Sequence, residues 1–128
     1  MAKTRNGFTL VEVLIVVAIV GVLSTIAIVL LASTQQGARI ARAQGDVRAI
    51  ASAAATYIAH TGSVPPSLAS LTGTAANEAG VTAGPFLARV PTPPSGGSPA
   101  WSAYAYTGNG DGTFAVTATG DGTSVRAP

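Results

Sequence analysis

One stretch near the N-terminus constrains the fold more than any other, namely the apolar run from Phe8 to Leu31. The twenty residues from Val13 to Ala32 carry no charge, and most of them are Val, Ile, Leu or Ala. About 20 such residues make a helix long enough to cross the hydrocarbon core of a bilayer. The single charge inside the run is Glu12. The sequence therefore predicts a membrane-spanning helix with a carboxylate near its start.

The edges of this run distinguish three interpretations. A cleaved secretory signal has a core of roughly 7 to 15 apolar residues followed by small residues at the cleavage site. This run is longer, and residues 30–32, Leu-Leu-Ala, lack the small-residue pattern of such a site. An uncut single-pass anchor for a small binding domain fits the length. It leaves Glu12 unexplained, because a desolvated carboxylate without a cation is costly. The third interpretation is cleavage between Gly7 and Phe8, which removes a short basic leader.

The third interpretation is favoured by a resemblance at this junction. The residues from Gly7 to Leu23, GFTLVEVLIVVAIVGVL, resemble the N-terminal signature of the type IV prepilin family. The resemblance implies cleavage after Gly7 by a membrane prepilin peptidase, methylation of the new Phe8 amine, and a glutamate five residues into the mature chain. Glu12 stands at that position. The expected site residues are thus Gly7 and Phe8 for processing and Glu12 for assembly.

Elementary electrostatics supports a role for Glu12. Cleavage at Gly7 frees an ammonium group on Phe8, and Glu12 lies one helical turn further on, where the helix dipole also favours an anion. In a filament, the carboxylate of one subunit can reach the amine of its neighbour. A subunit packed at the wrong stagger would then leave a charge buried alone, so the pairing would set the register.

These interpretations divide the chain into three parts. Residues 1–7 are the expected leader, residues 8–32 the transmembrane and filament-core helix, and residues 33–128 the second half of the helix with a globular head. Lys3 and Arg5 precede the span, which keeps the leader in the cytoplasm and sends the head outward. The expected location is the cytoplasmic membrane, followed by a periplasmic pseudopilus or a surface pilus.

Beyond the apolar run the pattern becomes amphipathic. From Ser33 to Thr61, apolar residues recur at spacings of three, four and seven, which predicts a helix with one apolar stripe; the stripe is Ile40, Val47, Ile50, Ala54, Tyr57 and Ile58. A coiled coil is an alternative, although about three Ala-rich heptads indicate one only weakly. We expect one continuous helix from about Phe8 to about His60, capped by Gly62.

The rest of the chain predicts a small head. Ser67 to Leu71 is expected to form a helical turn, Ala75 to Gly84 a mobile connection, and Phe86 to Val90 a first strand. The segment from Pro91 to Pro99 has turn chemistry and predicts a surface loop.

The clearest hairpin follows. Trp101 to Thr107 and Thr113 to Thr119 alternate in polarity around a Gly-Asn-Gly-Asp-Gly turn, and Thr123 to Arg126 follows as an edge strand. The predicted fold class is α+β. It combines a long N-terminal helix with a three- or four-stranded antiparallel sheet on its C-terminal half, and the aromatic side chains pack between the two.

The order of elements in the head also resembles, loosely, the major pseudopilin of type II secretion. That resemblance implies a calcium site in the C-terminal loop, for which Asn109, Asp111 and Asp121 are the candidate side-chain ligands. Calcium takes six to eight oxygen ligands. Asx-Gly turns explain the three residues better, so we expect no cofactor.

Composition excludes several classes of function. The chain has one histidine and no cysteine, and its few carboxylates are scattered, so no catalytic or metal-ligating constellation is predicted. The net positive charge does not indicate nucleic-acid binding, because Lys3 and Arg5 would leave with the leader. The predicted function is a filament subunit, either a pilin or a major-pseudopilin-like protein. The implied partners are further copies of the chain, the prepilin peptidase and methyltransferase, an inner-membrane assembly platform with its ATPase, and membrane lipid before assembly.

Overall fold

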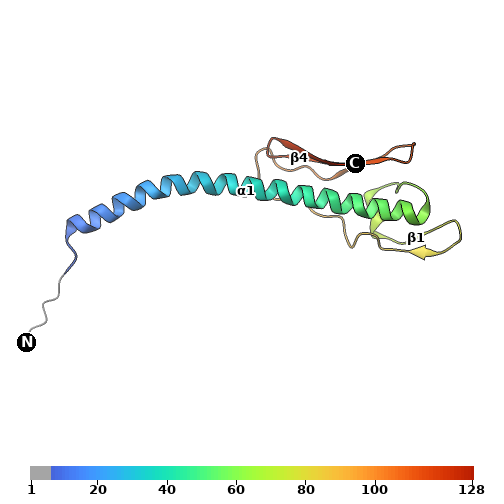
Figure 1. The fold of residues 1–128 in the computed structure, drawn as a ribbon, viewed down its shortest axis with the longest axis horizontal. Coiled ribbons are helices and arrows are strands. Elements are labelled where there is room, and N and C mark those ends of the chain that lie inside the picture. Colours follow the sequence, from blue (N-terminus) through green and yellow to red (C-terminus); the bar gives the residue numbers. More distant parts are fainter. Residues whose placement is uncertain (1–6) are drawn as a thin grey trace, which may run out of the picture. The chain divides into compact units, whose positions relative to one another are not determined.

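The computed structural model describes residues 7–128. They fall into two compact units that divide between Gln35 and Gln36. A single helix, α1 (Leu10–Thr61), begins in the first unit and ends in the second (Figure 1). The second unit also carries two small antiparallel sheets, one of two strands and one of three. The structure therefore confirms the predicted α+β class with one long N-terminal helix.

Both ends of α1 are capped by local hydrogen bonds. At the start, the hydroxyl of Thr9 accepts a hydrogen bond of 3.2 Å from the backbone N–H of Glu12. Thr9 is thus the N-cap of a Thr-x-x-Glu capping sequence. At the end, Gly62 adopts a φ of +76° and donates its N–H to the carbonyl of Ile58 at 2.8 Å. This left-handed cap is the one predicted for Gly62.

The predicted apolar stripe forms the helical side of the core in the second unit. Val47, Ile50 and Ala54 are completely or almost completely buried, and Ile40 and Tyr57 pack against them. Alanines fill the adjacent helical positions of the same core, namely Ala43, Ala51 and Ala53. Small side chains at these positions let the backbone of the sheet come close to the helix.

The three-stranded sheet consists of β3 (Ala105–Gly108), β4 (Phe114–Gly120) and β5 (Thr123–Ala127), paired antiparallel in the order β3-β4-β5. The pair of β3 and β4 is the predicted aromatic hairpin, and β5 is the predicted edge strand. The sheet contributes alternate side chains to the core it shares with α1, chiefly Val116, Ala118, Val125 and Ala127. Strand β4 lies along the second half of α1 in Figure 1.

Two aromatic residues before β3 belong to the same core, which makes the predicted start of that strand wrong. Trp101 and Tyr104 are both buried, so the residues from Trp101 to Tyr104 break the alternation of a strand. The hydroxyl of Tyr104 donates a hydrogen bond of 2.7 Å to Asp46 of α1. Burial and this bond raise the pKa of Tyr104 well above its usual value. The aromatic residues thus pack between sheet and helix, as predicted.

The segment between α1 and the aromatic hairpin begins with the helical turn predicted at Ser67 to Leu71, which is the 3₁₀ helix η1 (Leu68–Thr72). The structure differs from the prediction in the part that follows. Residues 75–84 were expected to be a connection and instead form a small hairpin of β1 (Ala75–Ala76) and β2 (Thr82–Ala83). The Asn77 side chain closes its turn by accepting a hydrogen bond from the N–H of Val81.

The expected strand from Phe86 to Val90 is absent, and this part of the prediction is wrong. Both Phe86 and Leu87 donate their N–H groups to one acceptor, the carbonyl of Leu71 at the end of η1. The ring of Phe86 meets that of Tyr57 edge to face, with 5.2 Å between the centroids. The segment is therefore held by a helix end and an aromatic contact in place of a strand partner.

A half-buried ion pair joins α1 to the turn between β4 and β5. Arg39 Nε lies 2.7 Å from Asp121 Oδ2, and Arg39 Nη2 lies 3.0 Å from Oδ1. The same carboxylate accepts hydrogen bonds from Trp101 Nε1 at 2.9 Å and from the N–H of Ser98 at 3.2 Å. Chiefly through the bond from Arg39, these donors lower the pKa of Asp121 from 3.8 to about 2.

Candidate functional site

The expected processing site precedes α1. Gly7 and Phe8 lie outside the helix and are exposed, and Phe8 keeps 82% of its surface accessible. A Cβ added at Gly7 would meet no atom within 4 Å. Packing among residues 7–128 therefore does not require a glycine at position 7.

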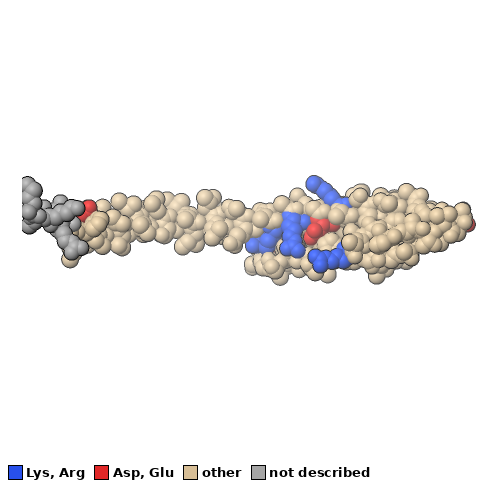
Figure 2. Space-filling model, turned by 90° about the horizontal axis from the view of Figure 1, so that it is seen from below, with Lys and Arg blue, Asp and Glu red and all other residues tan. Residues whose placement is uncertain are grey.

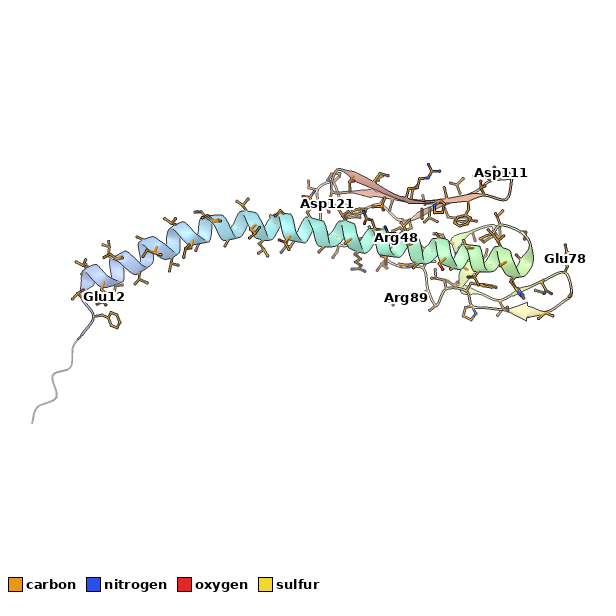
Figure 3. The ribbon with its side chains drawn as sticks, viewed as in Figure 1. Glu12, Arg48, Glu78, Arg89, Asp111 and Asp121 are labelled. Carbon is orange, nitrogen blue, oxygen red and sulfur yellow. The ribbon has the colours of Figure 1, made fainter. Side chains whose placement is uncertain are left out.

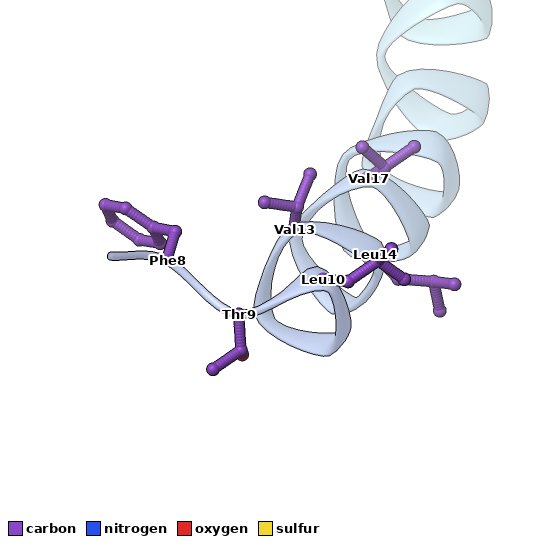
Figure 4. Close-up of a pocket in the computed structure, with 6 residues that line it drawn as sticks. All are labelled: Phe8, Thr9, Leu10, Val13, Leu14 and Val17. Carbon is purple, nitrogen blue, oxygen red and sulfur yellow. The ribbon is translucent and has the colours of Figure 1, made fainter. Parts of the chain in front are cut away.

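The side chain of Phe8 turns beside the first turns of the helix. Figure 4 shows its ring near Val13, in an open apolar groove of about 510 Å³ that also includes Leu10, Leu14 and Val17. A second groove of about 270 Å³ is lined by Phe8 and Glu12 together with Val13, Val16 and Val17. The structure thus brings Phe8 and Glu12 to the same end of the helix.

Glu12 occupies the first turn of α1 (Figure 3). A negative charge there is favoured by the helix dipole and by the N–H groups that lack partners at a helix start. Within residues 7–128 its carboxylate makes no ion pair and no hydrogen bond to another side chain. Thr9, which caps this turn, was not among the residues singled out from the sequence, although the Thr-x-x-Glu spacing is a recognisable signal.

Among residues 7–128, no other part of the chain covers the apolar part of α1. Every large apolar side chain from Phe8 to Leu31 is more than half exposed, from 51% for Val13 to 82% for Phe8. This surface is far more than a soluble chain leaves in water. Within the described residues, α1 is the one helix whose length and composition suit a bilayer, with a mean hydropathy of 3.1 over its most apolar window.

The polar side chains within this apolar stretch satisfy their own hydrogen bonds. Ser24 and Thr25 each donate at 2.7 Å to a carbonyl of the preceding turn, and Ser33 and Thr34 do the same at 2.9 Å. No hydroxyl of this set needs water, which suits an apolar environment.

The candidate calcium ligands are not brought together. Asp111 lies in the turn before β4 and Asp121 in the turn after it (Figure 3). The seven residues of β4 lie between them, and a strand of that length spans roughly 20 Å. Asn109 and Asp111 both bond to Thr113, which lowers the pKa of Asp111, and Asp121 is held by Arg39. Among the described residues, no group of three His, Cys, Asp or Glu side chains could hold a metal ion.

The single histidine also has a structural partner. His60 Nε2 lies 3.0 Å from the carbonyl of Val81, in the turn between β1 and β2, and its ring tilts toward that of Phe86. This contact ties the end of α1 to the small hairpin.

The comparisons with known proteins support a pilin- or pseudopilin-like protein. Residues 2–28 match the family model described as the prokaryotic N-terminal methylation motif. This finding and the similarity described next support the expected pilin and pseudopilin family, and they point to a structural protein.

The chain is similar to the type II secretion system core protein G of Pseudomonas aeruginosa. The two are 36% identical over 55 residues, which are 43% of this chain and 39% of that protein. The matched part thus spans about two fifths of the length of the curated relative. No solved structure matches the chain significantly.

Proposed function

We propose that this protein is the structural subunit of a filament of the type IV pilus class, assembled through its N-terminal helix. The observation that carries the proposal is the methylation motif at residues 2–28, placed at the head of an apolar helix with no cover. A surface of this kind requires either lipid or protein neighbours. A filament subunit uses both in turn.

The first step of the proposed pathway is removal of residues 1–7. The bond between Gly7 and Phe8 precedes the first residue of α1 and lies in exposed backbone, where a peptidase can bind it without unwinding the helix. Nothing within residues 7–128 requires the glycine. We therefore assign the need for Gly7 to the active site of a prepilin peptidase. The chain is a substrate in this reaction, and methylation of the new Phe8 amine follows.

Before assembly, the first half of α1 resides in the cytoplasmic membrane with the head outside the cytoplasm. The internally bonded hydroxyls of Ser24 and Thr25 remove the cost of burying them in lipid. An assembly platform and its ATPase would then supply the work of extraction. The apolar side chains lose no favourable environment, because helices of neighbouring copies replace the lipid around them.

In the filament, Glu12 pairs with the Phe8 amine of a neighbouring copy. A carboxylate in the first turn of an apolar bundle is costly without a cation, and Phe8 supplies one only after cleavage. Processing and assembly are thereby coupled, because an uncut chain lacks the ammonium group that neutralises Glu12. The similarity to a type II secretion protein favours a periplasmic pseudopilus, with a surface pilus as the alternative within the class.

Two substitutions of Glu12 test this proposal. Glu12→Ala removes the charge and the side chain of the capping sequence, whereas Glu12→Gln keeps a side chain suited to the third helical position and removes the charge alone. We expect both variants to be trimmed after Gly7 and to be lost from filaments. Thr9→Val is the matched control, because it removes the cap and retains the charge, and it should still assemble.

An uncut membrane-anchored binding domain is the alternative class of function. On that account, neither Glu12 variant changes the distribution of the protein between membranes and filaments. Filaments that contain Glu12→Gln at the level of the unchanged protein would contradict the proposed charge pairing.

A further inference from the structure

The charged residues of the head separate into two groups. Four exposed arginines occupy α1, β5 and the loop between β2 and β3, and we call them the arginine collar: Arg42, Arg48, Arg89 and Arg126. Figure 2 shows the Arg side chains of the head gathered over a short part of its length. Among the described residues, Arg48, Arg89 and Arg126 form no ion pair, and Arg42 lies 3.9 Å from Asp46.

The acidic side chains of the head are distributed differently. The carboxylate of Asp46 accepts a hydrogen bond from Tyr104, and that of Asp121 accepts hydrogen bonds from Arg39. The two exposed carboxylates, Glu78 and Asp111, lie in the turns at the far end of the head, and we call them the acidic tip (Figure 3).

Both turns of the acidic tip lie beside the end of α1. The turn that holds Glu78 is tied to the helix end by the contact of His60 with Val81. The turn that holds Asp111 follows Gly108, whose Cβ position is 3.6 Å from Val64. Arg48 precedes the last residue of α1, Thr61, by thirteen residues, which is roughly 20 Å of helix. The acidic tip is therefore separated by about that distance from Arg48, the collar arginine of α1 that is nearer to it.

We propose that the arginine collar is the docking surface for the acidic tip of a second copy of this chain, parallel to the first and displaced along α1 by about 20 Å. This inference rests on the proposed filament function, which makes the copies parallel. Two copies without displacement would place collar beside collar and tip beside tip, and both arrangements repel. A displacement of about 20 Å brings opposite charges together.

Such a contact joins two different surfaces of the same chain. A heterologous contact of this kind repeats from copy to copy without closing, which is the requirement for an open filament. The collar and tip would therefore add a contact between heads, while the apolar helices supply cohesion.

Site-directed crosslinking tests the inference, and the absence of cysteine makes each introduced thiol unique. Ala79→Cys lies beside Glu78, and Ala49→Cys lies beside Arg48; both positions are exposed, and neither change removes a charge. The two variants are expressed together in cells that assemble the protein, and intact filaments are treated with a short thiol crosslinker. We expect dimers from the mixture and monomers from either variant alone.

A charge variant provides the second arm. Adding Glu78→Lys and Asp111→Lys to the Ala79→Cys chain should lower the yield of dimer about fivefold, since it replaces two attractive contacts with repulsive ones. Dimers from Ala79→Cys alone, or no dimers from the mixture within intact filaments, would overturn the docking of tip on collar and leave the filament function standing. If no filaments form and the chain retains residues 1–7, the filament function itself is wrong and this inference falls with it.

Discussion

Arg39 of α1 holds Asp121 of the turn between β4 and β5 through two hydrogen bonds, across a separation of 82 residues in the chain. The exposed fraction of the Asp121 side chain is 4%, and that of Arg39 is 22%. Asp121 also has a φ of +49°, a left-handed conformation that Asp tolerates better than most residues. The ion pair therefore fixes the hairpin of β4 and β5 to α1.

Removing the Asp121 carboxylate should destabilise the head. Asp121→Ala leaves the guanidinium of Arg39 and the indole N–H of Trp101 without their acceptor, and we expect the melting temperature to fall by on the order of 5–10 °C. Asp121→Asn keeps a hydrogen-bond acceptor, so its melting temperature should fall by less than that of Asp121→Ala. Asp111→Ala is the control, because that carboxylate lies in an exposed turn, and it should change the melting temperature by less than about 2 °C. Equal losses at positions 111 and 121 would contradict the structural role of the ion pair.

The same carboxylate makes stability depend on pH. The pKa of Asp121 is lowered to about 2 in the folded protein from an ordinary 3.8, so its contribution is fully present above about pH 4 and is lost as the pH falls toward 2. Trp101 is the one tryptophan of the chain and donates to Asp121, so its fluorescence in a detergent-solubilised sample reports the change. We expect unfolding midpoints to fall between pH 4 and pH 2, and Asp121→Asn to remove most of that dependence.

Gly120 is required by a close approach of Trp101. A Cβ at position 120 would lie 2.8 Å from Trp101 Cα and still closer to the indole ring. Gly120→Ala should therefore cost about 1–3 kcal/mol of unfolding free energy, the usual range for overpacking a core. Gly110→Ala is the matched control, since no atom lies within 4 Å of its Cβ position and its φ is not positive. Chemical denaturation of both variants provides the comparison, and a Gly120→Ala protein as stable as the unchanged chain would contradict the packing.

Ile50 is the largest fully buried side chain of the head. Ile50→Ala should lower the free energy of unfolding by about 2–5 kcal/mol, because it removes apolar contacts and leaves a cavity between α1 and the sheet. Val81→Ala removes apolar carbon from a side chain that is 57% exposed and should have little effect. Urea titration of the two variants measures the difference, and similar midpoints would contradict the proposed core.

Features governed by local sequence could be predicted well. The 3.6-residue spacing of Val47, Ile50 and Ala54 identified the buried face of α1, and Gly62 marked its end, because both signals are contained within a few turns of helix. The aromatic hairpin was also predictable, since the turn residues and the alternation of β4 lie side by side in the chain.

Features that depend on distant partners could not be predicted. Phe86 to Val90 has the composition of a strand, yet two of its N–H groups bond to the carbonyl of Leu71. The partner of Asp121 was equally hidden, because Arg39 has the spacing of a solvent-facing helical residue and nothing nearby in sequence links the two. Trp101 was predicted to begin a strand but lies outside β3, and its indole N–H donates a hydrogen bond to the distant Asp121.

The most direct test of the central proposal is the intact mass of the protein recovered from its native cells, measured separately for membranes and for sheared surface material. We predict a mass that begins at Phe8 and includes one additional methyl group. Its presence in membranes and absence from sheared material would support a periplasmic pseudopilus, whereas its presence in the sheared fraction would identify a surface pilus. A mass that retains Met1 to Gly7, found in membranes alone, would contradict the proposal and leave an uncut anchored domain.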